Sequence, residues 1–226
     1  MPVDVNVETN DDEIYESPLL GNPEHAVTID LPSGDLANAA ESVIDDEGVL
    51  VPGAVFARLD KDNFGVLPAQ DAADKHSVDG ANTSANEITL NGVDLRDVVE
   101  RGDVIAVQGS TGNDGYYTVD RVTVAGGNTT LAVRESVDDG TADGEVWTSK
   151  FDAFGVMPDS RGLLQDGDSS TVSNHGKISL AVYTEGVFNL ALFDAQLKND
   201  GVSRSPAPEE VLALANSPRF TTLFNL

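Results

Sequence analysis

Residues 115–133, "GYYTVDRVTVAGGNTTLAV", decide the fold class because they form a pattern of two strands joined by a glycine turn. Apolar and polar residues alternate on both sides of "AGGN", as they do in half-buried strands. Three nearby segments, "EITLNG", "DVIAVQG" and "GEVWTS", are also strand-like, and turn-forming residues separate all of them. Between two of these segments, "DLRDVVERG" predicts a helical turn closed by Gly102. Residues 71–150 are therefore predicted to form a small antiparallel β barrel or sandwich.

A second β domain is predicted to flank this segment on both sides. The motif "FGVLP" at 64–68 recurs as "FGVMP" at 154–158, but the residues that follow the two copies differ. A tandem repeat predicts matching flanks, so we interpret residues 25–70 and 151–200 as one discontinuous host domain. The segment 71–150 is then an insertion in an exposed loop of that host, where insertions are tolerated.

Within the host domain, the apolar segment 177–194 is expected to form a hairpin that turns at Glu185–Gly186. The polar stretch 70–86 is expected to act as a linker, and a short helix is expected at 36–44.

The two ends of the chain differ from its middle. Residues 1–24 are acidic and contain three prolines, which predicts an extended N-terminal arm. A disordered terminus and an arm that orders on a partner fit this pattern equally well. Residues 201–226 are predicted to contain one short helix that begins near Pro208 and ends before Ser217–Pro218. The expected fold class is mainly β, with this arm and one short C-terminal helix.

Charge dominates the composition. The chain has 226 residues, 39 Asp plus Glu and 13 Lys plus Arg, and a formal net charge of −26. Such a charge opposes compaction in dilute buffer, whereas at molar salt the screening length falls to about 3 Å and the repulsion largely disappears. We therefore interpret the chain as adapted to concentrated salt, with an acidic protein that binds a basic partner as the alternative.

The same composition excludes several classes of function. A chain without a basic stripe is not expected to bind nucleic acid directly. The absence of cysteine excludes disulfides and thiolate chemistry. The N-terminal residues lack the pattern of a signal peptide, and no apolar run approaches the ~20 residues of a membrane span, so a soluble protein is expected.

The loop "GSTGNDG" at 109–115 raises the question of a phosphate site. Such a loop would lead directly into a helix, but here it leads into the alternating strand that begins at Gly115. Asn113, Asp114 and Gly115 are instead interpreted as a tight hairpin turn with positive φ angles. A segment at 60–71 has an EF-hand-like start, but Phe64 stands where an oxygen ligand belongs. No metal, cofactor or catalytic residue is predicted, and the chain is not expected to be an enzyme.

Two parts of the chain resemble known structural proteins. The frame "GVLVPGAVFARLD", "FGVLP", "FGVMPD" and "KISLAVYTEGVFNLALFDAQL" resembles the head decoration (capsid cement) proteins of lambda-like tailed phages, over residues 48–70 and 151–197. The segment "GDVIAVQGSTGNDGYYTV" at 102–119 is similar to a small β module of tailed-phage structural proteins. With the charge, the chain resembles a virion protein of a tailed virus that infects a halophilic archaeon. Decoration proteins of this kind are usually shorter, without an insertion or a C-terminal helix.

The resemblance implies a homotrimer on the capsid surface, made in the host cytoplasm, with the major capsid protein as its partner and no membrane. It implies a cementing role for the host domain and an outward position for the inserted domain. Apolar residues of the arm, the 177–194 segment and the tail are the expected interface. They are Ile14, Tyr15, Leu19, Leu20, Tyr183, Val187, Phe188, Phe220 and Phe224.

Three alternatives remain open at this point. The chain could be a tail or adaptor protein of the same virion, for which a ring is expected in place of a trimer. It could be a halophilic surface module that binds a sugar or a protein, although its aromatic residues are few. A hydrolase would need two carboxylates of displaced pKa in one pocket, and no pair stands out in the sequence.

Overall fold

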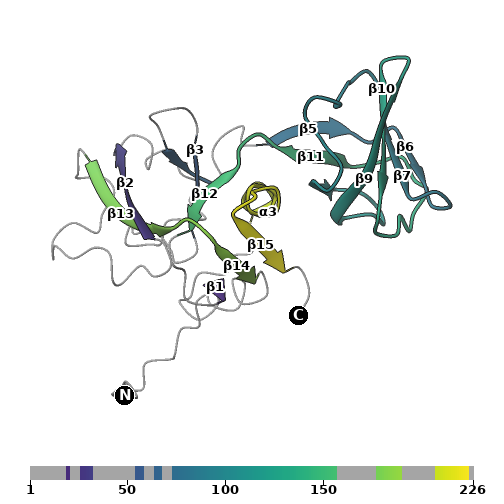
Figure 1. Ribbon diagram of the computed structural model, residues 1–226. Coiled ribbons are helices and arrows are strands. Elements are labelled where there is room, and N and C mark those ends of the chain that lie inside the picture. The colour runs from purple at the N-terminus through teal and green to yellow at the C-terminus, as the bar shows by residue number, and fades with distance from the viewer. Residues whose placement is uncertain are drawn as a thin grey trace.

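The structure is a computed structural model of the full chain, and it describes residues 19–20, 26–32, 54–58, 64–67, 73–156, 177–189 and 207–223. In these residues the protein is mainly β with one short C-terminal helix, as the sequence predicts, and its strands form three sheets (Figure 1).

The inserted segment forms a seven-stranded antiparallel sheet with the strand order β5-β11-β8-β9-β10-β7-β6. The five strands expected between residues 87 and 149 are all present, and two more strands precede them. The bounds are Ala73–Ser77 (β5), Gly80–Asn82 (β6), Glu87–Leu90 (β7), Val104–Gln108 (β8), Gly115–Ala125 (β9), Asn128–Val133 (β10) and Glu145–Ser149 (β11).

This sheet curls on itself without closing into a barrel. Strands β5 and β6 lie at its two opposite edges, yet only Val78 and Asp79 separate them in the chain. The long strand β9 joins the two halves, since its first part pairs with β8 and its remainder with β10. The curl encloses one apolar core. Its largest fully buried members are Ile88, Leu90, Leu95, Ile105 and Leu131.

The expectation that residues 70–86 are a linker is wrong for 73–82, which form β5 and β6. These strands are short and polar, so their own sequence carries little strand signal. They form because β11 and β7 supply hydrogen-bonding partners along them.

Residues from both sides of the inserted segment meet in a five-stranded sheet of order β2-β13-β12-β3-β4. Both copies of the repeated "FGV" motif are strands of this sheet, and both pair with β3 from opposite sides, antiparallel to it. The bounds are Ala26–Pro32 (β2), Val55–Arg58 (β3), Phe64–Val66 (β4), Ala153–Val156 (β12) and Lys177–Tyr183 (β13).

The third sheet joins the two ends of the chain. It contains β1 (Leu19–Leu20), β14 (Gly186–Asn189) and β15 (Phe220–Leu223), with β14 in the centre and β15 parallel to it. The expected hairpin at 177–194 is therefore wrong, because β13 and β14 pair with different strands in different sheets. Antiparallel partners come from the N-terminal side instead: β2 pairs with β13 and β1 with β14.

The C-terminal helix, α3, spans Pro208–Ala215 as predicted. Proline at its first position and two glutamates in its first turn favour this start. The carboxylate of Glu210 accepts a hydrogen bond of 2.9 Å from the backbone N–H of Ala207. Figure 1 shows α3 between β12 and the seven-stranded sheet. The helix expected at 36–44 lies outside the described residues.

Candidate interaction surfaces

The loop between β8 and β9 is organised by the side chain of Asn113, which is only 5% exposed. Its amide group donates to the carbonyl of Asp139 at 2.7 Å, and its carbonyl oxygen accepts from the backbone N–H groups of Asp138 and Asp139, each at 3.0 Å. The Tyr117 hydroxyl donates to the backbone carbonyl of Asn113 at 2.9 Å. The glycine-rich loop is therefore a hairpin connection tied to residues 138–139.

The expected backbone geometry of this loop is partly wrong. Asn113 and Asp114 do not have positive φ angles, whereas Gly109 does, at +71°. The connection is longer than a two-residue turn, so Asn113 stabilises it through side-chain hydrogen bonds and not through a left-handed backbone. Gly115 begins β9.

The carboxylates around this loop are occupied by hydrogen bonds within the chain. Asp114 accepts from the Ser110 N–H at 2.6 Å, and Asp143 accepts from the backbone and hydroxyl of Thr111. Hydrogen bonds from Thr141 lower the pKa of Asp139. Among the residues that the structure describes, no group of three or more His, Cys, Asp or Glu side chains could hold a metal ion.

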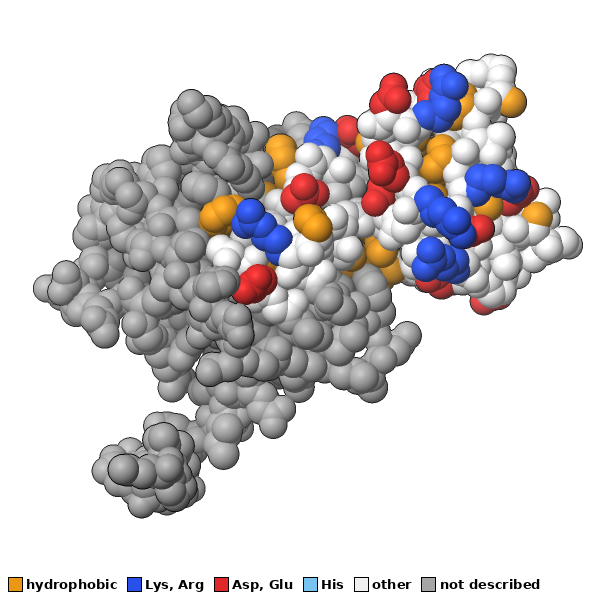
Figure 2. Space-filling view, in the orientation of Figure 1, with side chains coloured by type: hydrophobic (Ala, Val, Ile, Leu, Met, Phe, Trp, Pro, Cys, Tyr) orange, Lys and Arg blue, Asp and Glu red, His pale blue; other side chains and the backbone are white. Residues whose placement is uncertain are grey.

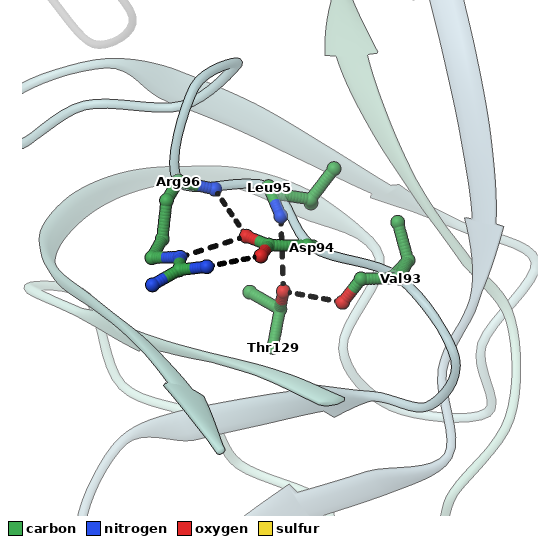
Figure 3. Close-up of polar contacts among 5 residues, drawn as sticks. All are labelled: Val93, Asp94, Leu95, Arg96 and Thr129. Atoms are coloured by element: carbon green, nitrogen blue, oxygen red, sulfur yellow. Dashed lines mark hydrogen bonds and ion pairs between the residues drawn. The ribbon is translucent and has the colours of Figure 1, made fainter. Parts of the chain in front are cut away.

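A second polar contact fixes the helical turn at 95–99 against the sheet (Figure 3). Thr129 on β10 is fully buried; its hydroxyl donates to the Val93 carbonyl at 2.7 Å and accepts from the Leu95 N–H at 3.1 Å. Beside it, the Arg96 guanidinium donates to Asp94, which lowers the pKa of that carboxyl. The hydroxyl holds Leu95 in the core, so this part of the inserted domain is structural.

On the outer face of the seven-stranded sheet, α3 covers part of β8, β9 and β11. A row of side chains crosses four strands there, because Lys75, Trp147, Ala106 and Tyr116 are register partners in turn. Leu212 of α3 forms a buried cluster with Ala106 and Val104, and Tyr116, Trp147 and Ala215 pack against it. Lys75 places its ammonium 3.7 Å from the centroid of the Trp147 ring.

Residues directly after α3 bind backbone groups of two sheets. The Val104 N–H donates to Oδ1 of Asn216 at 2.6 Å, and Nδ2 of Asn216 donates to the Val104 carbonyl at 2.9 Å. The Ser217 hydroxyl donates to the Ala153 carbonyl of β12 at 3.1 Å. The role of Asn216 has no signal in the sequence, since a single asparagine after a helix usually indicates only its C-terminal end.

A hollow of about 530 Å³ lies beside this contact, lined by residues 150–154 and 217–219. Arg219 lies over the Phe154 ring at 5.4 Å from its centroid, and Lys150 forms an ion pair of 2.9 Å with Asp74. The hollow therefore combines two cations with two aromatic rings.

Five of the nine predicted interface residues belong to the three-stranded sheet. Leu19 pairs with Phe188, Leu20 pairs with Val187, and Phe220 starts the neighbouring strand β15. Phe220 is 6% exposed. Tyr183 lies apart from them at the end of β13, paired with Ala26 and Val156. Ile14, Tyr15 and Phe224 lie outside the described residues.

Charged side chains of both signs are intermixed over the inserted domain (Figure 2). Ion pairs join Arg101 to Asp120 at 2.9 Å and Arg121 to Glu87 at 3.2 Å, and Arg96 pairs with Asp94. All three arginine side chains are largely exposed, so each pair contributes little to stability.

Comparison with models of known protein families finds no match, and no curated protein sequence matches the chain. In the part of the chain that the structure describes, no helix is long and apolar enough to cross a membrane.

Proposed function

We propose that this protein is a non-enzymatic structural component of a virion, which binds and stabilises the capsid shell as a decoration protein. One observation carries the proposal. Segments on both sides of residues 73–149 meet in one five-stranded sheet, while 73–149 form a sheet of their own. This is the arrangement expected for a small host domain interrupted by an outward β module, which the sequence resemblance implies.

The three-stranded sheet supports a role for the host domain in assembly. The N-terminal arm supplies β1 and the C-terminal tail supplies β15, and both flank β14. Five of the nine apolar residues expected at an interface therefore belong to one sheet. A decoration protein needs no active site, since contacts repeated by symmetry give large avidity. The proposed partners are the major capsid protein and two further copies of this chain.

The charge supports a setting of concentrated salt. A formal charge of −26 on 226 residues favours solubility and hydration of the surface, but at low ionic strength it opposes folding and assembly. We place the protein on the outer surface of a virion assembled in the cytoplasm of a halophilic host.

Light scattering tests the assembly. We expect a trimer in about 3 M salt, and dissociation or unfolding in about 0.1 M salt, because these concentrations span strong and weak screening. A well-folded monomer at both concentrations would contradict both the assembly and the salt adaptation. A larger ring would favour the tail or adaptor protein instead.

Labelling of particles tests the location. Gold-conjugated antibodies against this chain, applied to purified particles of the virus that encodes it, are expected to cover the whole shell. Label at a single vertex would assign the chain to the tail or its adaptor. Label on host cells but not on particles would support the surface-binding alternative.

A further inference from the structure

We propose that α3 and Asn216 form a clamp that holds the inserted β domain in one orientation relative to the host sheet. The proposal is independent of what the protein binds, and it makes the inserted domain a rigid projection and not a tethered one.

The covalent connection alone leaves a hinge. The chain enters the seven-stranded sheet at β5 and leaves it at β11, and these strands are paired neighbours at one edge, with Ala73 opposite Ser149. Both connections to the host therefore lie at the same end of one strand pair. A domain attached only through such a ribbon can pivot about it.

Asn216 attaches the domain at a second point. Strand β8 pairs with β11 only as far as Ala106, opposite Trp147, so the β11 side of Val104 has no strand partner in that ladder. The Asn216 amide occupies that place, accepting from the Val104 N–H and donating to its carbonyl. A side-chain amide that makes both bonds reproduces one rung of a β ladder. Because both hydrogen bonds must be close to linear, the Asn216 amide restricts the direction of β8 as well as its distance from α3.

The residues that follow Asn216 also form hydrogen bonds with strands of the host domain. Ser217, the next residue, donates to the Ala153 carbonyl on β12, and the Arg219 carbonyl accepts from the Gly186 N–H at 3.3 Å. Strand β15 then continues in parallel with β14. Within six residues the chain passes from the buried cluster around Leu212 to backbone contacts with the host.

Apolar packing by itself does not require this arrangement. Leu212 covers Val104 and Ala106, but the hydrophobic effect that favours this burial is non-directional, whereas a hydrogen bond has a preferred angle. If α3 only covered an apolar face, removal of the Asn216 amide would leave the orientation of the domain unchanged.

The chain offers its own probe of the clamp. Trp147 is its single tryptophan and packs against the cluster under α3, so acrylamide quenching of its fluorescence reports access to this joint. The chain has no cysteine, so spin labels can be attached at Ala125→Cys on the inserted domain and Thr184→Cys beside the host sheet. Their distance distribution reports the orientation directly.

We expect Asn216→Ala to broaden the distance distribution and to increase quenching of Trp147. The exposed Asn91→Ala, in the same domain, is the matched control and should change neither. Faster hydrogen exchange at the Val104 amide, with unchanged exchange at Leu131 in the core, would show that the domain stays folded.

Leu212→Ala is the second variant, and it should act in the same direction. A distance distribution as narrow in Asn216→Ala as in the parent protein would overturn the proposal, whatever the result for Leu212→Ala. So would a loss of protection at Leu131 together with Val104, since the amide would then support the fold of the domain and not its orientation.

Discussion

The side-chain amides of Asn113 and Asn216 bind backbone groups that have no backbone partner there. Each amide donates one hydrogen bond through its nitrogen and accepts through its oxygen. Asn113 binds the backbone of residues 138 and 139, and Asn216 binds the backbone of Val104. Thr129 does the same with one hydroxyl, between Val93 and Leu95. These side chains are uncharged, so their hydrogen bonds should depend little on the salt concentration.

Replacing Asn113 with alanine is expected to destabilise the inserted domain by about 2–3 kcal/mol, because three hydrogen bonds with the backbone of residues 138 and 139 are lost, each worth roughly 1 kcal/mol. Chemical denaturation in molar salt measures this free energy of unfolding. Asn91→Ala, at an exposed position, should stay within about 0.5 kcal/mol of the parent. Equal effects of the two substitutions would show that the Asn113 contacts do not stabilise the loop.

Gly144 gives a second test at this scale. Its φ is +81°, and an added Cβ would lie 2.8 Å from both the Gln108 carbonyl oxygen and the Ser110 nitrogen. Gly144→Ala should therefore cost more than the roughly 1–2 kcal/mol expected for a left-handed backbone alone.

Substitutions at two other glycines separate the effect of the left-handed backbone from that of the steric contact. Gly126 has a φ of +63° with open space around it, so Gly126→Ala measures the backbone term alone. Gly140→Ala should be nearly neutral, since its nearest neighbour would be 3.9 Å from the new Cβ. Thermal unfolding should rank the variants Gly144, Gly126, Gly140 from most to least destabilised. A Gly144→Ala variant no less stable than Gly126→Ala would mean that movement of the loop relieves the steric contact at Gly144.

At the scale of elements, the contact between α3 and β9 changes an ionisation. Burial, followed by the charges of Glu209 and Glu210 at the start of α3, raises the pKa of Tyr116 to about 12. The helix thus stabilises the neutral form of the Tyr116 side chain on β9 relative to its anion.

The stability of the protein should therefore fall as the pH rises from about 10 to about 12. The unfolded chain loses the Tyr116 proton near its ordinary pKa of 10.0, whereas the folded chain retains it up to about 12. Absorbance titration of the phenolates should show an ionisation at about pH 12 that is missing in Tyr116→Phe but present in Tyr117→Phe. The same late step in both variants would assign it to another of the four tyrosines.

At the scale of the whole molecule, the net charge of −26 sets the response to salt. Repulsion among carboxylates acts over about 10 Å at 0.1 M salt and about 3 Å at 1 M salt. The described ion pairs are exposed and few, so they offset little of that repulsion.

We expect the midpoint of thermal unfolding to rise steadily between about 0.1 M and 3 M salt. The triple substitution Asp97→Asn, Glu100→Gln and Glu145→Gln removes three exposed charges from the inserted domain. It should raise the midpoint at low salt and leave it unchanged at high salt. Equal gains at both concentrations would contradict an effect of charge repulsion.

The sequence by itself determined the parts of the fold with local signals. Alternation of apolar and polar residues identified β7 to β11, turn-forming residues marked their ends, and Pro208 with two glutamates marked the start of α3. Both copies of the repeated "FGV" motif form strands, and both strands pair with β3.

Only the tertiary structure decided what depends on partners distant in the chain. The polar segment 73–82 forms two strands because β11 pairs with β5 and β7 pairs with β6. Residues 177–189 do not form a hairpin because β13 pairs with β2 and β14 pairs with β1, in place of pairing with each other. The roles of Asn216, Trp147 and Lys75 arise where the C-terminal helix meets the inserted sheet. Local patterns record the periodicity and turn chemistry of one segment. The choice among competing strand partners is a difference in free energy between whole arrangements, which no single segment contains.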